Sequence, residues 1–80
     1  MANLTKAQTM SAIRALGLSV RCVDGEWRIT YRLDDARLGV AVVGPISRAR
    51  AIERAEAVSY YTNDRQDAID TARMMAERQA

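Results

Sequence analysis

Two runs in which apolar and polar residues alternate, 18–23 and 26–33, meet at the pair Asp24-Gly25. An Asp-Gly pair in this position is a strong signal for a two-residue β-hairpin, because both central residues of a type I′ turn need a positive φ. A slip of the pairing by one residue would turn every apolar side chain toward water. The sequence therefore predicts an antiparallel hairpin with one apolar face, formed by Leu18, Val20, Cys22, Trp27, Ile29, Tyr31 and Leu33.

The opposite face of this hairpin carries three arginines. Arg21 and Arg28 stand directly across from each other in the predicted register, and Arg32 lies further along the second strand. Like charges that face each other are unfavourable unless an anion bridges them. Tyr61 joins this face if its neighbour Tyr60 points inward. We take Arg21, Arg28, Arg32 and Tyr61 as candidate binding residues; the alternative is a solvated face whose arginine stems cover neighbouring backbone.

A helix is predicted before the hairpin. In Thr5-Lys6-Ala7-Gln8 the Thr5 hydroxyl can accept from the Gln8 amide while the Gln8 side chain reaches back, which is a capping box. Gly17 suits the left-handed residue that ends many helices. The apolar side of this helix consists of Met10, Ile13 and Leu16.

A strand and a further helix are predicted toward the C-terminus. Residues 55–62 alternate as in a strand, with Val58 and Tyr60 on one face and Tyr61 on the other, and either face can be the buried one. Asn63, with Gln66 three residues later, is expected to cap the helix that follows. The expected apolar stripe of that helix consists of Ala68, Ile69, Ala72, Met75 and Ala76.

Charges on the last helix follow the helix dipole. Asp64 and Asp67 lie in its expected first turn, while Arg73 and Arg78 lie toward its end. Together with Asp70 the two aspartates have a three-residue spacing that could bring carboxylates together at a metal or acid–base site. A solvated helix face is the favoured interpretation, because no further ligands accompany them.

The middle of the chain is the least regular part. Residues 34–37 are expected to form a loop, and the apolar run Leu38 to Val43 is too short to classify by periodicity. Gly44-Pro45 breaks the chain. Ser47 is then expected to cap a short helix that continues to about Glu56, with Ala49 and Ile52 facing inward.

These elements predict an α+β fold in one domain, residues 1–80. The expected order is α-β-β-irregular-β-α, with a small antiparallel sheet of three or four strands and the N- and C-terminal helices on one of its faces. The hydrophobic fraction is 49%, yet fourteen of those residues are alanine and none is phenylalanine. Because so small a core stabilises a domain weakly, a homodimer is an alternative.

Composition argues against several classes of function. The chain has no histidine, the commonest general base and metal ligand, and its one cysteine, Cys22, is expected to be a small buried hydrophobe. No phosphate loop, nucleophile elbow or zinc spacing occurs. We therefore expect no enzyme, no cofactor and no metal. No apolar run is long enough for a membrane span and no signal peptide is visible, so we expect no membrane contact and a cytoplasmic location.

Two stretches carry a resemblance to a known group of proteins. The segments 26–30 (EWRIT) and 55–64 (AEAVSYYTND), followed by Asp67-Ala68, resemble small uncharacterised proteins encoded by phages and prophages of proteobacteria. Residues 34–54 have no counterpart in this resemblance. It implies a phage accessory protein and brings no activity or site residues.

The order of elements also resembles the double-stranded RNA-binding domain. That fold places a basic N-terminus of its last helix on RNA phosphates. The corresponding turn here, Asn63-Asp64-Arg65-Gln66-Asp67, would repel phosphate, so the likeness is one of topology.

Two functions remain after these exclusions. The first is a non-enzymatic interaction module that binds an unknown protein partner through the arginine face or through the apolar run Leu38 to Val43. The second is nucleic-acid binding through Arg21, Arg28 and Arg32. Eleven of the twelve basic residues are arginine, which binds carboxylate and phosphate in a planar, bidentate manner. A protein partner is the favoured expectation.

Overall fold

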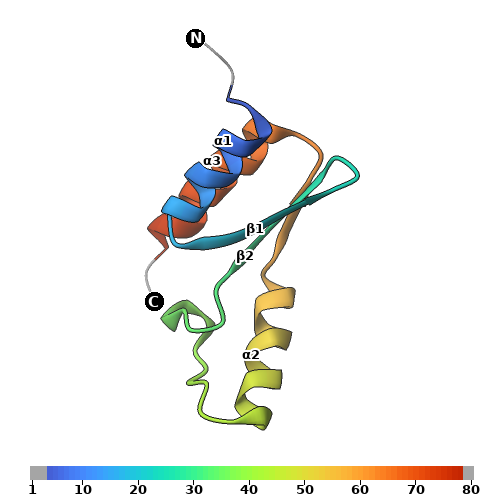
Figure 1. Ribbon diagram of the computed structural model, residues 1–80. Coiled ribbons are helices and arrows are strands. Elements are labelled where there is room, and N and C mark those ends of the chain that lie inside the picture. Colours follow the sequence, from blue (N-terminus) through green and yellow to red (C-terminus); the bar gives the residue numbers. More distant parts are fainter. Residues whose placement is uncertain (1–3, 79–80) are drawn as a thin grey trace.

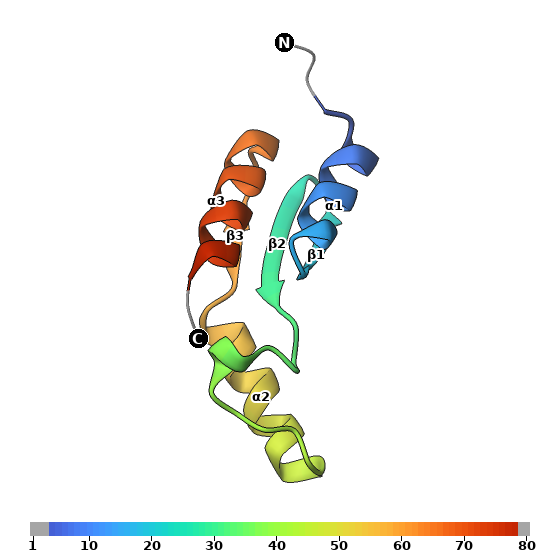
Figure 2. The ribbon, with the colours of Figure 1, turned by 90° about the vertical axis from the view of Figure 1, so that its left-hand side faces the viewer.

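The computed structural model describes residues 4–78 as a two-layer α+β fold, as expected (Figure 1). Three strands form one antiparallel sheet in the order β1-β2-β3. Helices α1 and α3 lie side by side on one face of this sheet, whereas α2, inserted between β2 and β3, extends beyond its end (Figure 2). The elements are α1 (Lys6–Ala15), β1 (Leu18–Val23), β2 (Glu26–Tyr31), a 3-10 turn η1 (Ala36–Leu38), α2 (Pro45–Ala57), β3 (Tyr60–Thr62) and α3 (Arg65–Glu77).

The hairpin between β1 and β2 has the predicted turn and register. Asp24 and Gly25 have φ values of 52° and 80°, as a type I′ turn requires. Val23 pairs with Glu26 next to the turn, and Leu18 pairs with Tyr31 at the other end. The alternation of buried and exposed side chains along both strands therefore follows the sequence pattern.

The core lies between the sheet and the two helices on it. Trp27 is only 3% exposed and Ile29 and Ile13 are fully buried, while Cys22 is half-buried at the margin. Leu38 reaches the same core from η1. The predicted apolar face of the hairpin is thus the face that the helices cover.

Helix α1 begins with the predicted capping box, in which Thr5 accepts from the Gln8 amide at 3.1 Å. It ends at Ala15, and Gly17, which follows the capping residue, has a left-handed φ of 84° and donates its N–H to the Arg14 carbonyl. The expectation that Leu16 belongs to the buried side is wrong: it is 36% exposed. Leu16 is the last, capping residue, where the chain is already turning toward β1, and Thr9 is buried instead.

The predicted helix after the Gly44-Pro45 break is longer than expected. It starts at Pro45, and Gly44 rather than Ser47 is the capping residue. Ser47 lies in the first turn of the helix, where its hydroxyl oxygen accepts the Gly44 N–H at 3.0 Å. The helix runs on to Ala57, so the expectation of a strand from residue 55 is wrong. The Ala-Glu-Ala sequence there has high helix propensity.

The face that α2 turns to the rest of the molecule also differs from the prediction. Ala51 and Ala55 are buried, whereas Ala49 and Ile52 are exposed. Alanine lets a helix approach its neighbours closely, and the two buried alanines form a narrow strip along α2. Val58 lies outside the shortened strand and is exposed, so only Tyr60 packs against the core.

Helix α3 is capped one residue later than predicted. Asp64 is the capping residue, and its carboxylate accepts from the amides of Gln66 and Asp67. Asn63 lies instead in the turn between β3 and α3, where the Thr62 hydroxyl oxygen accepts the Asp64 amide at 3.1 Å. The predicted apolar stripe is buried except at Ala76, which is half-buried.

The segment between β2 and α2 attaches to α3. The Arg37 guanidinium donates to the carbonyls of Met75 at 3.3 Å and Ala76 at 3.1 Å, and it pairs with Asp35. The Tyr31 hydroxyl donates to the same Met75 carbonyl at 2.9 Å. Arg78 lies past the end of α3, so Arg37, from another segment, supplies the positive charge at the helix C-terminus.

None of the helices among residues 4–78 has the length and apolarity that a bilayer crossing requires.

Candidate functional site

The arginines predicted to share a face lie on the side of the sheet opposite α1 and α3. Arg21, Arg28 and Tyr61 form one row across β1, β2 and β3. The Arg28 guanidinium carbon lies 5.0 Å from the centre of the Tyr61 ring, a cation–π contact. The alternation of hydrogen-bonded and non-hydrogen-bonded pairs explains why Arg28 leans this way. Counted from the turn, Arg21 and Arg28 are a hydrogen-bonded pair, whereas Arg28 and Tyr61 are a non-hydrogen-bonded pair, whose side chains approach more closely.

A row of hydroxyl groups lies next to the arginine row. Ser19 pairs with Thr30 on the neighbouring strands, and Ser59 stands beside Thr30 with 3.1 Å between their hydroxyl oxygens. Because the Ser59 hydroxyl donates to the Ala55 carbonyl at 2.7 Å, Thr30 is the donor to Ser59. This chain of hydrogen bonds ties the end of α2 to the outer face of the sheet.

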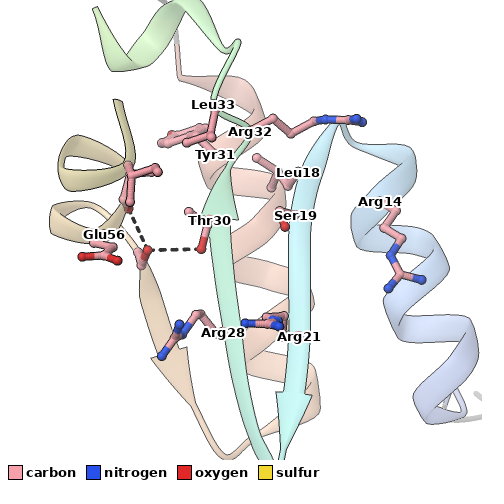
Figure 3. Close-up of a pocket in the computed structure, with 13 residues that line it drawn as sticks. Arg14, Leu18, Ser19, Arg21, Arg28, Thr30, Tyr31, Arg32, Leu33 and Glu56 are labelled. Carbon is pink, nitrogen blue, oxygen red and sulfur yellow. Dashed lines mark hydrogen bonds between the residues drawn. The ribbon is translucent and has the colours of Figure 1, made fainter. Parts of the chain in front are cut away.

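These two rows form the floor of an open groove with a volume of about 570 Å³ (Figure 3). Arg14, from the last turn of α1, and Arg32, just after β2, stand at its sides. Ile52 and Glu56 of α2 form the wall on the β3 side. We call this feature the arginine groove, with the guanidinium groups of Arg14, Arg21, Arg28 and Arg32 along it.

The charge of the arginine groove is strongly positive. Its four arginines are exposed, and none of them forms a salt bridge with a residue in the range 4–78; the recorded pairs are Arg37–Asp35 and Arg73–Asp70. Glu56 is the one acidic residue among the described residues that line it. The groove therefore has the composition of a site for an anionic ligand.

Three of the four predicted site residues, Arg21, Arg28 and Arg32, line the groove, and Tyr61 borders it at β3. Sequence reasoning did not include Arg14 or Glu56. Arg14 reaches the groove because Gly17 turns the chain sharply from α1 into β1. Glu56 reaches it because α2 runs into residues expected to form a strand. Neither position has a sequence signal that relates it to the sheet face.

The carboxylates of α3 have structural partners. Asp64 caps the helix, Asp70 pairs with Arg73 at 3.7 Å, and Asp67 accepts the Tyr60 hydroxyl at 2.5 Å. This hydrogen bond is the main reason why the pKa of Asp67 is lowered and the pKa of Tyr60 is raised. No group of three or more metal-ligating side chains occurs within the described part of the chain.

The apolar run Leu38 to Val43, the other surface considered for a protein partner, is divided by the fold. Leu38 is buried in the core, so it is unavailable to a partner. Val42 and Val43 are exposed near the start of α2, where Ile46 joins them. The surface that remains at this tip is therefore smaller than the predicted run.

Comparisons of the chain with protein-family models, with curated proteins and with solved structures found no match. The function is accordingly inferred from the geometry and charge of the arginine groove.

Proposed function

We propose that this protein is a non-enzymatic interaction module, of the phage accessory type, that binds an acidic segment of a partner protein in the arginine groove. The observation that carries the proposal is the set of four exposed arginines on one groove without a carboxylate partner among residues 4–78. Arginine in such a position binds carboxylates through two parallel hydrogen bonds.

The pairing of Arg21 with Arg28 supports an anionic ligand. Cα atoms of such a hydrogen-bonded pair are about 5.5 Å apart, so two like charges rise from neighbouring positions on the sheet and repel each other, with the Arg28 guanidinium leaning toward Tyr61. A carboxylate between them would turn this repulsion into attraction. The cation–π contact with Tyr61 holds the Arg28 side chain over the sheet and limits its loss of freedom on binding.

Single-stranded nucleic acid is the second candidate, and Tyr61 is the observation that favours it. This ring is 45% exposed beside the arginines, as on surfaces where bases stack. A protein ligand is favoured because Arg28 already covers one side of the ring, and the other aromatic residue of the groove, Tyr31, is only 3% exposed and cannot stack on a base.

A binding titration separates the two candidates. A short fluorescein-labelled peptide rich in glutamate and serine and a labelled oligo-dT are each titrated with the protein at low and high salt, and fluorescence anisotropy is measured. We expect the peptide to bind. We also expect the triple variant R21Q/R28Q/R32Q to weaken its binding about tenfold or more, because each lost charge pair contributes up to about 1 kcal/mol.

The matched control removes three arginines that lie away from the groove, in R50Q/R65Q/R73Q, and should change the affinity by less than about twofold. Binding of oligo-dT alone, with a steep dependence on salt that the triple variant flattens, would replace the protein partner by nucleic acid. Binding of neither probe would refute both candidates.

A further inference from the structure

The arginine groove has its positive charges at two levels, separated by the hydroxyl row. Arg21 and Arg28 form the first level and Arg32 forms the second, while Arg14, from α1, lies at the side of the groove between them (Figure 3). Between them lie Ser19 and Thr30, which carry no charge. From this arrangement we infer that the partner segment is extended and presents two carboxylates four residues apart, one for each level. The inference rests on the proposed function, since it describes the ligand of that same groove.

The spacing follows from strand geometry. Arg28 lies in β2 and Arg32 one residue past its end, and both line the groove; at about 3.4 Å per residue of extended chain, the Cα atoms of the two levels are about 14 Å apart. An extended peptide laid along β2 has the same rise, and its side chains i and i+4 point to the same side. The carboxylates at i and i+4 of such a peptide therefore meet the two levels together.

A helical ligand does not fit this spacing. In an α-helix the rise is 1.5 Å per residue, so residues i and i+4 are only about 6 Å apart along the axis. One helical i, i+4 pair can reach one level of the groove and leaves the other without a counter-charge. Among ligands with two carboxylates four residues apart, the distance between the levels therefore selects an extended one.

The hydroxyl row and Glu56 determine which side chain the ligand can have at position i+2, between its two carboxylates. The side chain at i+2 of the ligand would lie over Ser19 and Thr30, beside Glu56 on the α2 wall (Figure 3). A third carboxylate at this place would face Glu56 and be repelled. A small uncharged side chain at i+2 meets hydroxyl groups, and the half-exposed Ile52 lines the same wall.

The test uses three labelled peptides of identical composition, rich in threonine and valine so that they favour an extended backbone, with two glutamates at i and i+2, at i and i+4, or at i and i+6. We expect the i, i+4 peptide to bind at least about fivefold tighter than the other two, because only it engages both levels. In R32Q this preference should disappear, whereas R73Q, on α3 at the opposite face of the sheet, should keep it.

The outcomes separate this inference from the proposed function. Equal affinity for the three spacings, with binding still lost in R21Q/R28Q/R32Q, would overturn the two-level ligand and leave the acidic partner in place. Tighter binding of a helix-stapled i, i+4 peptide would overturn the extended conformation. Failure of all acidic peptides to bind would refute the proposed function itself. A second expected result is that E56Q raises the affinity of a peptide with a third glutamate at i+2 and leaves that of the i, i+4 peptide nearly unchanged.

Discussion

Replacing Arg37 by alanine should destabilise the fold, although the sequence predicts a loop in this segment. Its guanidinium donates to the Met75 and Ala76 carbonyls at the end of α3, pairs with Asp35 at 3.4 Å, and lies 5.2 Å from the centre of the Tyr31 ring. The side chain is only 22% exposed. Hydrogen bonds from charged donors contribute about 1.5 to 3 kcal/mol each when they are shielded from water.

The loss of stability in R37A is smaller than the sum of the contributions of these contacts. The Met75 carbonyl keeps the hydrogen bond from the Tyr31 hydroxyl in the variant, so only the Ala76 carbonyl loses its partner in this group. We therefore expect R37A to lower the free energy of unfolding by about 1.5 to 3 kcal/mol. For a domain of this size, that corresponds to a decrease in Tm of about 6 to 24 °C.

Urea denaturation followed by the fluorescence of Trp27, the single tryptophan, measures this loss. R73A is the matched control, because Arg73 makes an exposed pair with Asp70 on the same helix and should cost less than about 1 kcal/mol. R37K tests the geometry: an ammonium group keeps the charge but cannot reproduce the fork that meets two carbonyls, so only part of the stability should return. Equal stability of R37A and R73A would refute the role of Arg37 as the cap of α3.

Two further predictions concern the core and the Tyr60–Asp67 hydrogen bond. W27A should lower the free energy of unfolding by about 3 to 5 kcal/mol, a large part of what an 80-residue domain has, and a Tm within a few degrees of wild type would show that Trp27 does not hold the core together. For Y60F we expect a pH-dependent loss of stability, measured by urea denaturation across pH. The lowered pKa of Asp67 stabilises the fold above its unfolded pKa and this contribution disappears as the pH falls through the folded value. The raised pKa of Tyr60 stabilises the fold below about pH 10, and this contribution disappears as the pH rises through the folded value. The two proteins should therefore differ most near neutral pH and converge at both extremes; a constant difference from acid to alkaline pH would contradict this assignment.

Local signals in the sequence predicted the elements whose geometry is set by neighbouring residues. The Asp24-Gly25 turn fixed the register of the hairpin, and the alternation along it identified the buried face that contains Trp27 and Ile29. The Thr5 capping box located the start of α1. The same alternation predicted, without knowledge of the tertiary structure, that the arginines lie on the opposite face.

The parts that could not be predicted depend on contacts between distant segments. Helix propensity extended α2 into residues 55–57, which the alternation of apolar residues assigned to a strand. Asp64 rather than Asn63 caps α3, and the local sequence does not decide between them because both residue types are good caps. Arg37 meets α3 across nearly forty positions of the chain, and no local pattern indicates that contact. The phage resemblance, the homodimer, the cytoplasmic location and the lack of enzymatic activity stay predictions.

The uncovered side of the sheet has a consequence for how such a chain can change over time. Along β1 and β2, every second side chain contributes to the interior and every other one points away from it. Substitutions at the outward positions alter which ligands the surface binds and leave the interior intact, because adjacent residues of a strand point to opposite faces of the sheet. One small scaffold can in this way exchange its ligand by a few changes of alternate residues and keep the same fold.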